Sequence, residues 1–211
     1  MNFTDFFNTF IENLKHTGLL EFIAVIAGIL SVWYSRKENI LVYPVGLINT
    51  ILYTYLSIKG SLLGEASVNL YYTAMSLYGW YMWSRVDKSN HVVLHISYAS
   101  TKEWWQHIGF FAAFYAILFI ILTFAKKGFA PDVIPWADAL ASASAYTGMW
   151  LMAKKKVESW YWWIITNIAS IPLYYVKHYA FTSVYYFILL IMAFWGLAEW
   201  RKKAAAKTAS I

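Results

Sequence analysis

Two stretches of the chain share one plan, and that plan decides the fold. Residues 36–59 read RKENILVYPVGLINTILYTYLSIK, and residues 154–177 read KKKVESWYWWIITNIASIPLYYVK. Each stretch begins with a basic cluster, continues through an apolar run long enough to cross a bilayer, and ends in a lysine. The charges mark the ends of the runs, and the runs themselves predict transmembrane α-helices.

The composition of the whole chain supports this interpretation. Of its 211 residues, 60% are hydrophobic and 13% are charged, whereas an average soluble domain has about 25% charged residues. A spanning helix needs roughly 20 apolar residues, so the chain accommodates seven spans and leaves no room for a separate soluble domain. The lack of cysteine excludes disulfides, thiolate catalysis and Cys-ligated metals.

Seven apolar segments separated by polar connections are the predicted spans. They cover about residues 19–34, 40–58, 65–83, 107–125, 134–152, 160–176 and 181–200. Before them, residues 1–18 place Phe and Leu at helical spacing opposite Asp5 and Glu12. This pattern predicts an amphipathic helix in the membrane interface. A short helix that caps the bundle is the alternative.

The distribution of Lys and Arg predicts the orientation. With seven spans, twelve of the 17 basic residues fall on the side of the C-terminus and five on the other side. The positive-inside rule then places the C-terminus in the cytoplasm and the N-terminus outside the cell, in a multi-pass inner membrane protein. Because the charges lie in connections between spans, the net charge of +6 indicates topology, and no nucleic-acid partner is expected.

The two quoted stretches also align with each other. At an offset of 118, Arg36-Lys37 match Lys154-Lys155, Asn49 matches Asn167 and Lys59 matches Lys177; after a one-residue gap, Gly79 matches Gly196 and Trp83 matches Trp200. We therefore expect an all-α membrane protein with two parallel three-helix repeats. The repeats cover residues 19–84 and 134–203, a linker and fourth helix cover 85–127, and a cytoplasmic tail covers 204–211.

Polar residues inside spans are the candidate substrate contacts, because they are costly there unless they line a cavity or pair with each other. Asn167 offers an amide without burying a charge, and Trp163 lies one turn before it on the same face. Ser170 and Tyr174 continue that stripe. A flat, cationic ring with an amide or ribose would suit this face. Hydrogen bonding between helices is the alternative role for each asparagine.

Residues in the first repeat complete the predicted site. Asn49 is the counterpart of Asn167 in the alignment. Asn69, Thr73 and Tyr53 lie on the neighbouring spans at positions that could line the same cavity. Trp160, by contrast, lies close to the cytoplasmic interface, and we interpret it as part of an aromatic belt.

The sequence lacks the patterns of several other function classes. No chain of acids or histidines crosses the predicted membrane, which favours facilitated diffusion over proton-coupled pumping. Metal-ligand spacing, a nucleophile elbow and a phosphate-binding glycine loop do not occur. We therefore predict no catalytic residue, no metal and no cofactor.

From about Glu21 to Trp200 the chain resembles the PnuC family of nicotinamide riboside transporters. The residues that carry the resemblance are Tyr43-Pro44-Val45-Gly46, Ser76 to Trp83 (SLYGWYMW), Glu158 to Trp163 (ESWYWW), Asn167, Ser170 to Tyr174 (SIPLY), Gly196 and Trp200. Tyr43 replaces the tryptophan that is usual in the family.

This resemblance implies a 3+1+3 arrangement like that of the SWEET sugar transporters. It also implies uptake of nicotinamide riboside across the membrane without an energising ion, and a kinase in the cytoplasm that traps the substrate by phosphorylation. Related families carry thiamine, riboflavin or deoxynucleosides, so another ring-bearing vitamin is the alternative substrate. A membrane enzyme or assembly protein is the alternative from another class, and a homo-oligomer stays open.

Overall fold

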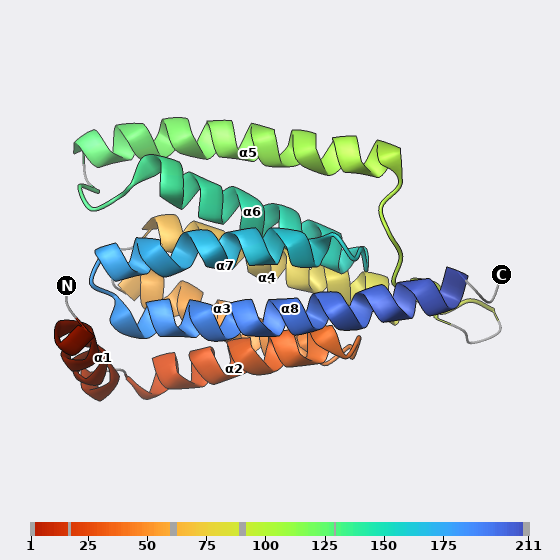
Figure 1. Cartoon of the computed structure of the whole chain (residues 1–211), viewed down its shortest axis with the longest axis horizontal. Helices are drawn as coiled ribbons and strands as arrows, with labels where there is room; N and C mark the ends of the chain where they lie inside the picture. The colour runs from red at the N-terminus through yellow and green to blue at the C-terminus, as the bar shows by residue number, and fades with distance from the viewer. Residues whose placement is uncertain (1–2, 17, 60–62, 89–91, 129, 209–211) are drawn as a thin grey trace.

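The all-α prediction is confirmed. A computed structural model describes residues 3–16, 18–59, 63–88, 92–128 and 130–208. Within these residues the chain forms eight helices: α1 Phe3–His16, α2 Leu19–Arg36, α3 Val42–Lys59, α4 Leu63–Ser84, α5 Thr101–Gly128, α6 Pro135–Ala153, α7 Ser159–Val176 and α8 Ala180–Thr208. Helices α2 to α8 run along the long axis of the molecule, and α1 crosses one end of the bundle (Figure 1).

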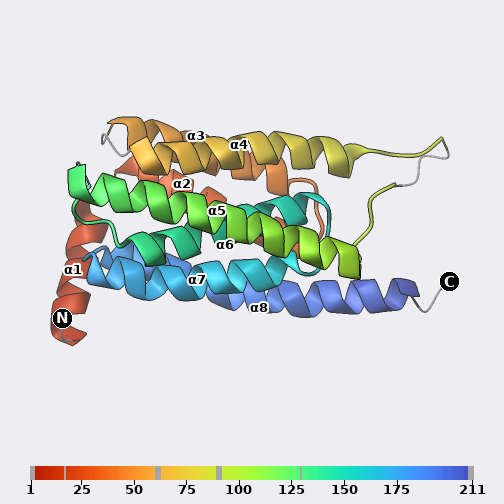
Figure 2. The same cartoon turned by 90° about the horizontal axis from the view of Figure 1, so that it is seen from above.

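The helices pack as two triplets. In the first triplet α2 contacts α3 and α3 contacts α4; in the second, α6 contacts α7 and α7 contacts α8. The triplets meet where α2 packs on α8 and α4 on α6, while α5 packs on α6. Seen from above, α3 and α4 lie on one side of the bundle and α7 and α8 on the other (Figure 2).

Equivalent positions are 117 residues apart already in the second helix of each triplet, whereas the alignment used an offset of 118 from Arg36 to Lys59 and reached 117 only after its gap. Helices α3 and α7 have bounds that differ by this number at both ends. Glu38 and Lys155, which pair with each other at the same separation, both have left-handed backbones, with φ of 60° and 51°. Asn167 is therefore equivalent to Thr50 and not to Asn49. Asn49 and Asn167 are 118 residues apart, and matching them to each other shifted the alignment by one residue.

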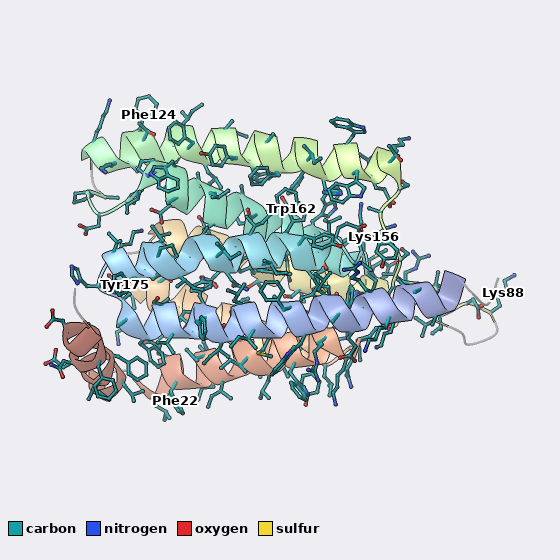
Figure 3. All side chains as sticks on the ribbon, in the orientation of Figure 1. Phe22, Lys88, Phe124, Lys156, Trp162 and Tyr175 are labelled. Atoms are coloured by element: carbon teal, nitrogen blue, oxygen red, sulfur yellow. The ribbon has the colours of Figure 1, made fainter. Side chains whose placement is uncertain are left out.

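Three of the described helices are long and apolar enough to cross a membrane by length and composition, namely α2, α5 and α8. On their outer faces, Phe22 of α2 and Phe124 of α5 point away from the bundle (Figure 3). These rings are 45% and 69% exposed, as expected for side chains that meet lipid. By contrast, α6 is largely buried and rich in Ala, Ser and Gly, which permit close packing.

The first helix packs against the last one, and the last helix is longer than the predicted seventh span. Helix α1 packs on α8, where the rings of Phe10 and Phe181 have centroids 6.0 Å apart. Helix α8 continues through Thr208, into the residues predicted as a tail; residues 209–211 of that tail lie outside the described residues.

At the start of α5, the Ser100 N–H donates to Glu103 and the Glu103 N–H donates to Ser100 Oγ. This capping box extends α5 beyond its apolar core.

Candidate functional site

A cavity of about 100 Å³ lies between the two triplets. The residues that line it are uncharged: Ser31, Val32, Ser35, Val42, Tyr43, Ser76, Met149, Met152, Trp160, Trp163, Asn167, Leu189 and Ala193. A space of this size holds several water molecules, whereas pockets for drug-sized ligands measure about 300–1,000 Å³. A ring-bearing solute would therefore need the triplets to separate before it could enter.

Equivalent residues of the two triplets face each other across this cavity. Four pairs in its lining are 117 residues apart: Val32 and Met149, Ser35 and Met152, Tyr43 and Trp160, Ser76 and Ala193. One pair is in direct contact, since Ser35 Oγ donates to Met152 Sδ at 2.9 Å. The cavity thus lies where the two triplets are related to each other, which is the place expected for a site between repeats.

Two large rings are held in place at the cavity by glycines. A Cβ added to Gly79 would overlap the ring of Tyr43, and a Cβ added to Gly196 would overlap the ring of Trp160. Each ring also meets an indole edge-on. The ring centroids of Tyr43 and Trp83 are 5.2 Å apart with an interplanar angle of 87°, and those of Trp160 and Trp200 are 5.6 Å apart with an angle of 88°. The same packing solution therefore occurs in both triplets.

Trp160 corrects a prediction. Its side chain is 1% exposed and lines the cavity, so its assignment to an aromatic belt was wrong. Tyr43, also 1% exposed, was missed as a lining residue. Within the described part of the chain, neither Tyr43 Oη nor Trp160 Nε1 has a hydrogen-bond partner. The paired glycines in the aligned segments were the signal that could have identified both rings.

Trp163 and Asn167 are the predicted residues that the structure brings to the cavity. Trp163 fits because Gly148 lies opposite, where a Cβ would stand 3.2 Å from the indole ring. Asn167 is 2% exposed and lines the cavity, so its amide is placed to meet whatever occupies the cavity.

The other predicted residues do not line the cavity. Asn49 Nδ2 donates to the carbonyl of Ala24 at 2.7 Å, which is the interhelical role weighed as its alternative. Thr73 Oγ1 lies within hydrogen-bond distance of both Thr50 Oγ1 and the Asn69 carbonyl, at 2.9 Å from each. The remaining three positions are Ser170, buried within α7; Tyr174, whose ring stacks on Tyr186 at 5.2 Å; and Tyr53, half-buried on α3.

Helix α5 supports the helix that carries the site. His107 of α5 is fully buried, and its Nδ1 accepts a hydrogen bond from Trp162 Nε1 at 3.2 Å. At the start of α5, Glu103 pairs with Lys156 at 2.9 Å. Desolvation opposes the ionisation of Glu103, but the Ser100 N–H and Lys156 together outweigh it and hold the pKa of this carboxyl below its ordinary value. Sequence reasoning did not identify these supports.

The cavity offers aromatic faces, hydroxyls and one amide, a set that suits binding of a flat polar solute. Among the described residues, no group of three or more His, Asp or Glu side chains could hold a metal ion.

Comparison with known proteins places this arrangement in a family. The profile of the nicotinamide mononucleotide transporter family matches residues 18–202. The nicotinamide riboside transporter PnuC of Escherichia coli is 27% identical, and the match covers 88% of this chain and 86% of that protein. The riboflavin/roseoflavin transporter RibM of Streptomyces davaonensis is 25% identical over the same shares.

A crystal structure of the vitamin B3 transporter PnuC has a similar fold, with a TM-score of 0.70 over 95% of this chain and 88% of that chain, at 21% identity. The resemblance seen in the sequence is confirmed by these matches. The chain is a multi-pass membrane protein that belongs to the nicotinamide mononucleotide transporter family.

Proposed function

We propose that this protein transports nicotinamide riboside across the inner membrane by facilitated diffusion. The observation that carries the proposal is that Trp163 and the amide-bearing side chain of Asn167 line one cavity between the triplets. A pyridinium ring over a desolvated indole gains about 2 kcal/mol. The Asn167 amide can donate to and accept from the carboxamide or the ribose of the same solute.

The proposed membrane topology has seven spans, α2 to α8, in a 3+1+3 arrangement with α5 as the single intervening helix. Matching bounds of the triplets and the contacts of α2 with α8 and α4 with α6 support it. The basic ends of the helices would face the cytoplasm and α1 would lie at the outer interface. Rocking of the triplets would open the cavity to each side in turn.

Coupling to an ion is not part of the proposal, because the described lining of the cavity is uncharged. Net uptake would then depend on a cytoplasmic kinase that phosphorylates the imported nucleoside. The protein itself would perform no chemistry. Riboflavin is the second candidate substrate, since the relative from Streptomyces davaonensis is named for it.

Uptake into liposomes tests the proposal. Purified protein would be reconstituted and given labelled nicotinamide riboside, riboflavin or thiamine, each with and without a proton or sodium gradient. We expect equilibration of nicotinamide riboside that no gradient drives beyond the external concentration. Uptake of riboflavin or thiamine instead would replace the proposed substrate, and accumulation driven by a gradient would contradict facilitated diffusion.

A further inference from the structure

A group of charged residues joins the two triplets at their basic end. Glu38, in the connection between α2 and α3, accepts from Lys155 Nζ at 2.8 Å and from Lys203 Nζ at 3.4 Å. Lys155 follows α6 and Lys203 lies on α8, so both bonds run from the first triplet to the second. The Lys155 side chain is only 4% exposed and that of Glu38 24%. We call these three residues the charged lock.

The backbone at the centre of the lock has an uncommon conformation. Glu38 and Lys155 both have positive φ, at 60° and 51°, a region that side chains other than glycine rarely adopt. They occupy equivalent positions, and each turn aims its side chain at the other. Such a conformation persists only where surrounding contacts determine it. The ion pair therefore belongs to two matched turns that meet across the triplet interface.

Beneath the lock, two indoles cross between the triplets. Trp83 Nε1 donates to the Met152 carbonyl at 3.3 Å, and Trp200 Nε1 donates to the Ser35 carbonyl at 3.0 Å. Lys155 Nζ lies 4.6 Å from the centroid of the Trp83 ring, so the lock packs directly on this layer. Met152 and Ser35 line the cavity. The lock, the crossed indoles and the cavity are thus successive layers along one path.

On the side of the cavity away from the lock, the interface has a different kind of contact. There Tyr71 Oη donates to the Tyr146 carbonyl at 3.1 Å, and their rings lie 4.4 Å apart. The ion pair at that end, Lys177 with Asp138 at 2.8 Å, joins α6 to the residue after α7 and stays within the second triplet. Opening the basic end must separate charges, whereas opening the opposite side of the cavity separates these tyrosines.

We propose that the charged lock of Glu38, Lys155 and Lys203 is a gate that closes the cavity toward the basic end of the helices. Its ion pairs must separate for a solute to pass there. The inference rests on the proposed transport function, because only a transporter needs this end to open. It assigns gating to three residues that do not themselves line the cavity.

Thiol accessibility tests the gate without measuring transport. The chain contains no cysteine, so Ser76→Cys places a single thiol in the cavity with little change in size. A charged, membrane-impermeant maleimide would be applied to each face of sealed membrane vesicles. Lys202→Cys, on the exposed end of α8, would identify the basic face independently.

In this background Glu38→Gln should raise the rate of Ser76→Cys labelling from the basic face about fivefold, the size expected from the loss of one well-formed ion pair. Lys203→Met should raise it less, because its bond to Glu38 is longer and more exposed. Asp138→Asn, which removes an ion pair within one triplet, should leave the rate unchanged. Folding of each variant would be checked by size-exclusion chromatography.

Equal labelling rates in the parent and in folded Glu38→Gln would overturn the gate, as would an equal rise in Asp138→Asn. If Glu38→Gln does not fold, Lys203→Met decides by the same criterion. The expected labelling without uptake of nicotinamide riboside would support the gate and contradict the proposed substrate. Uptake of nicotinamide riboside with unchanged labelling would support the proposed substrate and contradict the gate.

Discussion

At the cavity, α7 of the second triplet carries Trp163 and Asn167, whereas the equivalent positions on α3 of the first triplet carry Gly46 and Thr50. Four other pairs of lining residues occupy equivalent positions, and one of these pairs, Tyr43 and Trp160, has the same packing environment in both triplets. The comparison separates two kinds of residue. We infer that the matched pair Tyr43 and Trp160 builds scaffold that both triplets need, and we propose that the unmatched Trp163 and Asn167 supply groups that recognise the solute.

Replacing one of the matched rings should have the largest effect, and the property that changes should be the stability of the protein. Trp160→Ala removes a side chain that is 1% exposed and should lower the free energy of unfolding by about 3–5 kcal/mol, measured as a fall in Tm. Trp105→Ala is the control, because Trp105 is 72% exposed on α5; it should cost less than about 1 kcal/mol. A similar fall in both variants would show that Trp160 is not part of the scaffold.

Replacing the unmatched indole of Trp163 should have the next largest effect, and the property that changes should be the affinity for the solute. Trp163→Ala should weaken the affinity for nicotinamide riboside about 30-fold, the equivalent of a desolvated cation–π contact. Titration calorimetry on the purified protein measures this change. Trp136→Ala, on the exposed side of α6, should leave Kd unchanged. An unaltered Kd in Trp163→Ala would remove this ring from the site and leave Asn167 as the distinguishing residue of the second triplet.

The two asparagines sharpen the comparison, since the same substitution should act on different properties. Asn167→Ala should raise Kd about three- to tenfold, the value of one hydrogen bond, with little change in Tm. Asn49→Ala breaks the bond to the Ala24 carbonyl and should lower Tm with little change in Kd. The opposite pattern would mean that Asn49 binds the solute and that Asn167 only packs.

Much of this arrangement could be predicted because its signals are local in the sequence. Apolar runs ended by charges identify helices, and Trp163 and Asn167 share a helix face at one-turn spacing. The role of Trp160 could not be predicted in this way, because interfacial and buried tryptophans look alike until Gly196 is known to lie opposite. Asn49 was placed in the site by an alignment one residue out of register, which periodicity alone does not correct.

Contacts between distant segments were the other gap. The bond from Trp162 to His107 and the pairing of Glu103 with Lys156 depend on how α5 docks, and no pattern in the sequence fixes that docking. The positions equivalent to Trp162 and Lys156 in the first triplet are Val45 and Asn39, which offer no such partners. The helix with the proposed binding residues is therefore the one that α5 holds in place.

Glu103 allows a test of this one-sided support, with the smallest expected effect. Its pKa is lower in the folded protein than its ordinary value near 4.5, so the stability that it contributes is present at neutral pH and is lost as pH falls from that value through the lowered pKa. Because about a third of the side chain is exposed, the contribution should be below about 1 kcal/mol.

Glu103→Gln should therefore lower Tm slightly at pH 7, and the difference from the parent protein should shrink when both are measured in acid, below the lowered pKa of the carboxyl. Lys102→Gln changes a neighbouring exposed charge and should give no such convergence. A difference that stays constant across this pH range would mean that Glu103 acts through the helix cap alone. A shrinking difference together with a higher Kd at pH 7 would show that the hold of α5 on the second triplet extends to Trp163 and Asn167.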